Sequence, residues 1–133
     1  MYRTLALAIA FLVMPATADN APVIDCDSPA ISQIDMDVCA ATEMEKAQQD
    51  EGMVFAAIRD TLKGERAREA FFDEERTWTA RRDAECQEIL DDPEDYRLKT
   101  MYHRECLRDA AKARTGELTA RLCRKHPHQG LCR

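Results

Sequence analysis

The sequence predicts an all-α protein, a small antiparallel bundle of three helices held together by disulfides. Three long segments are rich in Ala, Glu, Arg, Lys, Leu and Met, which favour helix. No run of alternating apolar and polar residues is long enough to predict a strand. The chain of 133 residues also contains six cysteines. In an exported protein, that number indicates three cross-links supporting a core of modest size.

The chain begins with the pattern of a secretory signal peptide. The basic Arg3 precedes the apolar run LALAIAFLVM, and Pro15 and the small residues at 16–18 follow it. The run is shorter than the roughly 20 residues that cross a bilayer. We therefore expect residues 1–18 to be a signal peptide and the mature protein to be soluble, in the periplasm or secreted. Cys26 lies well beyond residue 18, so no lipid or membrane anchor is expected.

The remaining residues, 19–133, are expected to form a single helical domain. The whole chain has 25 acidic and 19 basic residues, which gives a net charge of −6. An acidic balance argues against nucleic acid as a partner, because phosphates require a basic surface. It favours a basic partner, or serves solubility alone.

The first helix is expected to begin after Ser32, which can cap it, with Asp35 placed close to a capping box. Gly64 is a natural stop at its end. Gly52 costs about 1 kcal/mol relative to alanine and allows a kink. Apolar residues recur at helical spacings along the segment: Met36, Ala40, Met44, Ala47, Val54, Ile58 and Leu62.

Two further helices are expected, separated by the segment DDPEDY at 91–96. The second runs from about Glu65 to Leu90. Pro93 then ends or restarts a helix, and the surrounding acids suit a helix N-terminus. The third helix extends to about Lys125, and the tail 123–133 is irregular. The expected inner residues are Ala67, Phe71, Trp78 and Ile89 on the second helix, and Leu98, Tyr102, Cys106, Ala110, Ala113 and Leu122 on the third.

Six cysteines allow 15 connectivities, and the helix layout favours one of them. Two antiparallel helices bring together positions equidistant from the turn between them. Cys86 and Cys106 are centred on position 96, so they fit a pair across this turn if regular packing of the third helix begins near Leu98. Cys26 would then hold the N-terminal segment at Cys39, and Cys123 would pair with Cys132 in the tail.

Three stretches resemble the lysozyme-inhibitor LprI-like family of exported bacterial proteins: CDSPAISQIDMDVCAATEMEKAQQD, RTWTARRDAEC and YHRECLRDAAKARTGEL. The family pattern is a cysteine pair around the start of the first helix, a W-x-x-x-R-D-x-x-C block, and a later cysteine followed by R-x-x-x-L. Here that ending corresponds to Cys106, Arg114 and Leu118, and the resemblance covers about residues 26–122. Two features depart from the pattern. The family's usual D-x-x-L-N-x-x-Y is absent after Asp50, and the tail with Cys123 and Cys132 lies outside it.

Trp78, Arg82 and Cys86 are spaced four residues apart and share one helix face. With the cysteine in a disulfide, this face carries no nucleophile. An arginine can lay its stem on the indole ring while its guanidinium pairs with a carboxylate, such as Glu75 or Glu85. We expect Trp78, Arg82 and Asp83 to form a structural anchor. The alternative is that Arg82 and Asp83 contact a partner directly.

Other candidate sites are weaker. Cys123, His126, His128 and Cys132 could be read as a metal site, but a disulfide with two exposed histidines is favoured because exported cysteines oxidise. Neighbouring acids such as Asp91 with Asp92 are expected to be solvated, since no apolar cleft would shift their pKa values. Hydrolase motifs and a phosphate-binding glycine loop are absent from the sequence. We expect no enzyme activity, no cofactor and no bound metal.

The family resemblance implies an inhibitor that binds a basic lysozyme and blocks peptidoglycan hydrolysis. An acidic protein would be steered toward such a partner. The candidate contact residues are the acids of the second turn: Asp91, Asp92, Glu94 and Asp95. Like charge keeps them out of the catalytic carboxylates, so the blocking group should be neutral or basic. The alternatives are a periplasmic interaction or envelope-stress module that does not inhibit, and a small hydrolase or metal carrier. The oligomeric state is not determined by the sequence.

Overall fold

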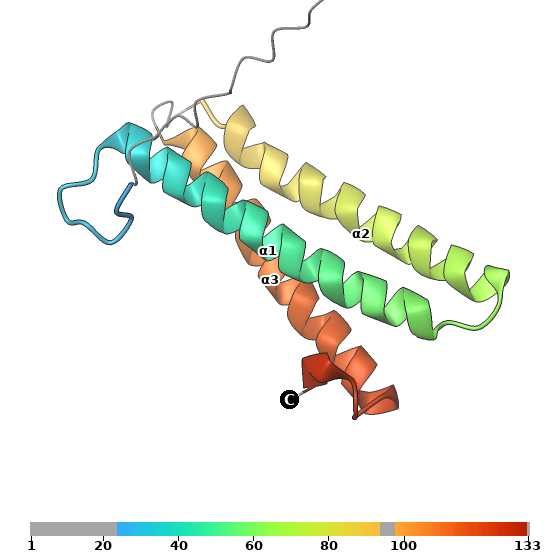
Figure 1. Cartoon of the computed structure of the whole chain (residues 1–133). Helices are drawn as coiled ribbons and strands as arrows, with labels where there is room; N and C mark the ends of the chain where they lie inside the picture. Colours follow the sequence, from blue (N-terminus) through green and yellow to red (C-terminus); the bar gives the residue numbers. More distant parts are fainter. Residues whose placement is uncertain (1–23, 94–97, 133) are drawn as a thin grey trace, which may run out of the picture.

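The computed structural model describes residues 24–93 and 98–132, and these residues form three long helices (Figure 1). α1 spans Gln33–Thr61, α2 spans Glu65–Asp91 and α3 spans Lys99–Lys125. A short 3-10 helix, η1, covers Gly130–Cys132. The described residues contain no strand, so the all-α prediction is confirmed. The expected signal peptide at 1–18 lies outside the described residues.

The helix boundaries follow the local sequence signals. The Asp35 backbone N–H donates to Ser32 Oγ at 3.1 Å, and Ser32 Oγ donates to Asp35 Oδ2 at 2.6 Å, so Ser32 caps α1 as predicted. α1 continues through Gly52 as one helix. Gly64 has a φ of 87°, a left-handed conformation that glycine adopts without strain. Gly64 therefore turns the chain from the end of α1 directly into α2.

The bundle runs up, down and up, with α2 antiparallel to both α1 and α3 (Figure 1). α1 packs most extensively against α3, to which it is parallel. Small buried side chains at Ala40, Ala47 and Ala111 allow these two backbones to approach closely. None of the described helices has the length and apolar character needed to span a membrane.

The apolar core lies in the half of the bundle near the α1–α2 loop. Its buried members are Val54, Ile58, Phe71, Leu118 and Leu122. Phe55 packs at its edge, with its ring 4.7 Å from Phe71 and 5.3 Å from Phe72, measured between centroids. Burying these side chains contributes roughly 1.5–3 kcal/mol for each fully enclosed residue.

All three predicted disulfides are present. Cys26–Cys39, Cys86–Cys106 and Cys123–Cys132 have Cα–Cα distances of 5.9, 5.7 and 5.5 Å. α2 ends at Asp91 and α3 begins at Lys99, so Cys86 and Cys106 lie at nearly equal distances from the turn, as the hairpin geometry requires. Cross-links therefore hold the start of α1, the α2–α3 turn and the C-terminal tail.

The predicted inner face of α3 is partly wrong. Tyr102 is 39% exposed and Ala113 is exposed. Leu122 is buried as predicted, but the other buried positions are Ala111, Arg114 and Leu118. The buried face of α3 is rotated about the helix axis relative to the predicted face. It includes Arg114, which a hydrophobic pattern assigns to solvent.

Candidate functional site

A layer of charged side chains crosses the middle of the bundle, and Arg114 of α3 is its centre. Arg114 is only 8% exposed. Its Nη2 donates to Glu74 Oε1 at 2.8 Å and to Glu75 Oε2 at 3.0 Å, both on α2. Burial opposes the charge of Arg114, but its hydrogen bonds to the two glutamates outweigh burial and raise its pKa. One guanidinium thus ties α3 to α2 between the apolar core and the Cys86–Cys106 cross-link.

Glu74 connects this layer to a second arginine. Arg121 Nη1 donates to Glu74 Oε2 at 2.8 Å, and the Arg121 guanidinium lies 5.1 Å from the centroid of the Phe71 ring. Burial favours the neutral acid at Glu74. The hydrogen bonds from Arg121 and Arg114 nevertheless lower the pKa of Glu74, so this carboxylate stays ionised.

α1 contributes Glu51, an acid that is also 8% exposed. Burial, a hydrogen bond with Glu75 and the charge of Glu75 raise the pKa of Glu51 to about 7, against the nearby charges of Arg82 and Arg114. Two carboxyl groups that hydrogen-bond to each other need a proton between them, because a carboxylate can only accept. The layer therefore holds one protonated acid, Glu51, below neutral pH. Ionisation of Glu51 above neutral pH is opposed by burial and by the charge of Glu75.

Trp78 lies on the outer side of this layer and is half-buried, not interior as the sequence suggested. The guanidinium carbons of Arg82 and Arg114 lie 5.1 and 5.5 Å from the centroid of its ring. Both distances are within the range of cation–π contacts. The ring also borders an open groove with Asp73, Arg81 and Arg114. Trp78 stays partly exposed because buried charges, and not apolar side chains, surround its inner edge.

Arg82 pairs with its sequence neighbour Asp83. Its Nη2 and Nε donate to Asp83 Oδ1 at 2.6 and 2.8 Å. The partners suggested by spacing are engaged elsewhere, since Glu75 binds Arg114 and Glu85 lies 3.8 Å from Arg81. The adjacent R-D pair of the motif therefore forms one unit, in which Asp83 orients the guanidinium that contacts Trp78.

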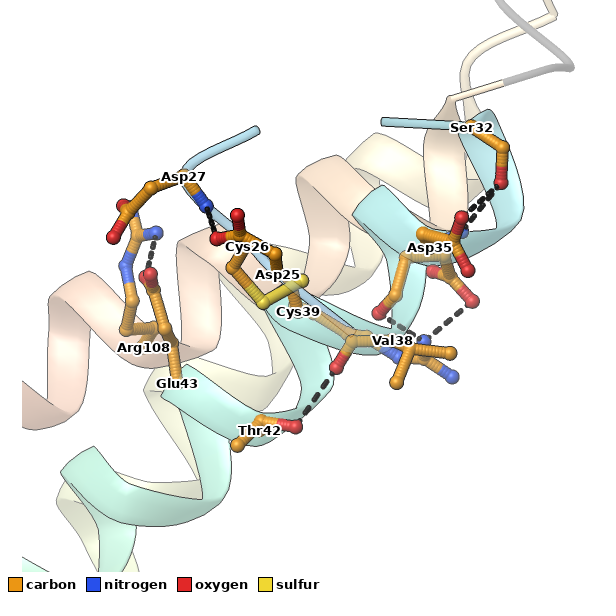
Figure 2. The surroundings of a disulfide bond; sticks show 12 residues. Asp25, Cys26, Asp27, Ser32, Asp35, Val38, Cys39, Thr42, Glu43 and Arg108 are labelled. Carbon is orange, nitrogen blue, oxygen red and sulfur yellow. Dashed lines mark hydrogen bonds and ion pairs between the residues drawn. A yellow bond between two sulfur atoms is a disulfide. The ribbon is translucent and has the colours of Figure 1, made fainter. Parts of the chain in front are cut away.

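A second cluster surrounds the Cys26–Cys39 disulfide (Figure 2). Arg108 Nη1 of α3 donates to Glu43 Oε2 of α1 at 2.8 Å, beside the cross-link. The Arg108 guanidinium also binds Asp109, and this hydrogen bond lowers the pKa of the Asp109 carboxyl. One turn earlier, Arg104 Nη1 donates to the Asp37 backbone oxygen at 2.9 Å and pairs with its carboxylate. Two arginines of α3 thus tie the N-terminal half of α1 to α3, and the disulfide holds the preceding segment against α1.

The acids proposed as partner contacts are described only in part. Asp91 and Asp92 are exposed at the C-terminal end of α2, where Gln87 Nε2 donates to Asp91 Oδ1 at 3.2 Å. Glu94 and Asp95 lie outside the described residues. The expectation that the acids begin a helix is wrong for this first pair. α3 starts only at Lys99, so Asp91 and Asp92 end α2, where negative charge opposes the helix dipole.

The tail residues that could be read as metal ligands do not form such a set. Cys123 and Cys132 are joined in a disulfide, which removes the thiolates that a metal would need, and His126 and His128 are exposed. Within residues 24–93 and 98–132, no three His, Cys, Asp or Glu side chains are grouped to hold a metal ion.

The burial of the charged residues Glu51 and Arg114 was not predicted from the sequence. Their spacing carried a signal: Glu51 follows Ala47 by four residues and precedes Val54 by three, which places it on the inner face of α1. Arg114 precedes the buried Leu118 by four residues on α3. A charged residue in register with a buried stripe on each of two helices could have been read as an internal ion pair.

The arrangement is that of a rigid scaffold, and comparison with known proteins identifies its family. The sequence model of the family described as lysozyme inhibitor LprI matches residues 26–118. This range includes Trp78, Arg82, Asp83, both cysteines of the central cross-link and the buried Arg114. Searches of the curated proteins and of the solved structures give no match. The match spans more than half of the chain, and the protein therefore belongs to the lysozyme inhibitor LprI family.

Proposed function

We propose that this protein is an exported inhibitor that binds a basic lysozyme and blocks peptidoglycan hydrolysis. The observation that carries the proposal is the family match over residues 26–118. The N-terminal pattern from Arg3 to the small residues at 16–18 and the three cross-links support export to the periplasm or beyond the cell.

The acidic end of the bundle supports contact with a basic partner. Asp91 and Asp92 are exposed at the end of α2, although negative charge there destabilises the helix through its dipole. Exposed acids at one end of the bundle can steer a cationic partner electrostatically. We propose that they guide the encounter and that Trp78, Arg82 and Asp83 act as an internal anchor.

The blocking group should be neutral or basic. The start of α1 offers a neutral side chain. Ile34 is 78% exposed in the first turn of α1. The start of α1 lies at the end of the bundle where α2 finishes (Figure 1). An exposed apolar side chain at this end of the bundle could enter a cleft without repulsion from its catalytic carboxylates.

The test is a lysis assay with the oxidised mature chain. Lysis of bacterial cell walls by a basic lysozyme should slow in proportion to added protein, and an unrelated acidic helical protein should have no effect. Full lytic activity at large molar excess over the enzyme would contradict the proposal.

A second candidate is a periplasmic binding module that does not inhibit lysozyme. It is favoured by one departure from the family pattern: Asp50 is followed by Met53, Val54 and Ala57, without the usual asparagine and tyrosine. The two candidates differ in one observable. Tight binding of lysozyme with undiminished lysis, or no binding at all, would support the module.

A further inference from the structure

Unpaired basic side chains gather at the end of the bundle opposite to Asp91 and Asp92. We define the basic end by five exposed residues: Lys63, Arg66, Arg68, Arg124 and Lys125. None of them belongs to an ion pair in the described part of the chain. By contrast, the arginines of the central layer are bound to carboxylates, and so are Arg104 and Arg108 of α3. Among residues 24–93 and 98–132, no carboxylate forms an ion pair with the basic end.

Lys63 lies in the α1–α2 loop, Arg66 and Arg68 lie in the first turn of α2, and the other two residues lie in the last turn of α3. α1 and α3 are parallel, so the α1–α2 loop and the segment after α3 finish together (Figure 1). Leu62 of the loop and Cys132 of the tail both pack against the same apolar core. The basic end is thus one surface region, built on the buried cluster of Ile58, Phe71 and Leu122.

An apolar side chain accompanies the bases. Leu131 of η1 is 42% exposed. The tail that presents it is folded, because Cys132 is cross-linked to Cys123, the Gln129 N–H donates to the His126 oxygen and the Cys132 N–H donates to the Gln129 oxygen. Leu131 is therefore exposed on a folded tail that follows Arg124 and Lys125 in the sequence.

We propose that the basic end docks on the surface of an anionic phospholipid bilayer, with Leu131 entering the headgroup region. A phosphate-rich surface complements unpaired lysines and arginines, and a soluble polyanion would leave the leucine without a role. Each basic residue near such a surface raises partitioning by a factor of about five. Glu65 and Glu69, exposed at the start of α2, offset part of this attraction. Docking in this orientation directs Asp91 and Asp92 away from the membrane.

The experiment measures cosedimentation of the oxidised mature chain with vesicles at low salt. The vesicles contain phosphatidylcholine alone or phosphatidylcholine with one third phosphatidylglycerol. We expect binding to the anionic vesicles only, with a loss on addition of salt, which screens charges over about 10 Å at 0.1 M. Equal binding to both vesicles, or to neither, would overturn the proposal.

Matched variants test the location of the site. Arg124→Gln with Lys125→Gln should lower partitioning by at least about tenfold. Lys46→Gln with Lys112→Gln removes two exposed charges outside the basic end and should change it by less than about twofold. Similar losses in the two pairs, with unchanged circular dichroism, would remove the site from this end.

Leu131→Ser separates a membrane surface from a soluble polyanion. It should weaken vesicle binding and leave binding to inorganic polyphosphate unchanged. If polyphosphate competes fully and Leu131→Ser binds vesicles like the unaltered chain, the leucine has no part and the lipid assignment fails. A salt-sensitive dimer that forms in place of vesicle binding would show that the basic end pairs with the acidic end of another copy.

Discussion

Residue 51 shows how a single buried acid can dominate the local energetics of a small bundle. Glu51 lies in register with the apolar residues of α1, and its nearest acid is Glu75 of α2. Arg82 and Arg114 compensate only in part, since the pKa of Glu51 is raised to about 7. Removing one partner of such a buried charge network leaves an uncompensated charge, so loss of a partner should destabilise the fold. Protonation of Glu51 should therefore be measurable as a pH dependence of stability.

Glu51→Gln should remove a pH dependence of stability. The folded pKa lies above the ordinary value of 4.5, so the stabilisation is fully present below pH 4.5 and is lost as the pH rises through 7. Up to about 3 kcal/mol of unfolding free energy is involved. Urea unfolding from pH 5 to 8 should show the unaltered chain losing stability relative to Glu51→Gln. Glu45→Gln, at an exposed position of α1, is the control, and parallel profiles for all three proteins would contradict the prediction.

Trp78→Ala should destabilise the protein by about 1–3 kcal/mol, less than the 3–5 kcal/mol typical of a fully buried aromatic residue, because the indole is only half-buried. Trp78→Phe should recover most of the loss by keeping a ring beside Arg82 and Arg114. Denaturant unfolding measures both changes. A loss below about 0.5 kcal/mol for the alanine variant would remove Trp78 from the proposed anchor.

At the scale of the helices, α2 depends on side-chain links more than α1 and α3 do. α1 and α3 approach through buried alanines and pack extensively, whereas α2 has only Phe71 and Cys86 as buried residues. Arg114, Arg121 and the Cys86–Cys106 bond add to this attachment. Loss of a single cross-link should therefore weaken the packing of α2 more than that of α1 or α3.

Replacing both Cys86 and Cys106 by alanine should cost about 3 kcal/mol, from the entropy of a loop of this length. The Cys123–Cys132 disulfide closes a shorter loop. Replacing both of its cysteines by alanine should cost about 2.5 kcal/mol at most. Guanidinium unfolding of the oxidised proteins measures both. Equal or reversed losses would indicate that the hairpin cross-link does not hold α2.

For the whole molecule, charge is distributed along the long axis of the bundle. Exposed acids end α2 beside the start of α1, and the unpaired bases lie at the opposite end. The paired charges between them neutralise each other inside the bundle. A net charge of −6 therefore understates how differently the two ends interact with charged partners.

Association with a basic lysozyme should consequently depend on one end only. Asp91→Asn with Asp92→Asn should lower the association rate on the order of threefold at low salt, while dissociation changes little. Glu65→Gln with Glu69→Gln, at the opposite end, should leave the association rate nearly unchanged. Stopped-flow or surface-based kinetics at two salt concentrations measures this, and equal effects of the two pairs would show that steering is not local.

Most of the fold could be predicted from the sequence because its signals are local. Ser32 and Gly64 mark helix boundaries through contacts within a few residues, and each disulfide joins cysteines no more than 20 positions apart. The candidate site was predicted less completely. The motif located Trp78, Arg82 and Asp83, but it did not show that Arg82 pairs with Asp83 or that Glu75 binds Arg114.

The sequence by itself determined the helices, their order and their cross-links, since these depend on composition, spacing and short loops. Only the tertiary structure decided that Glu51 and Arg114 are buried, that Trp78 is only partly buried and that exposed bases lie at one end. These properties depend on how three helices are rotated about their axes. A rotation of a few tens of degrees exchanges buried for exposed positions without altering any local pattern.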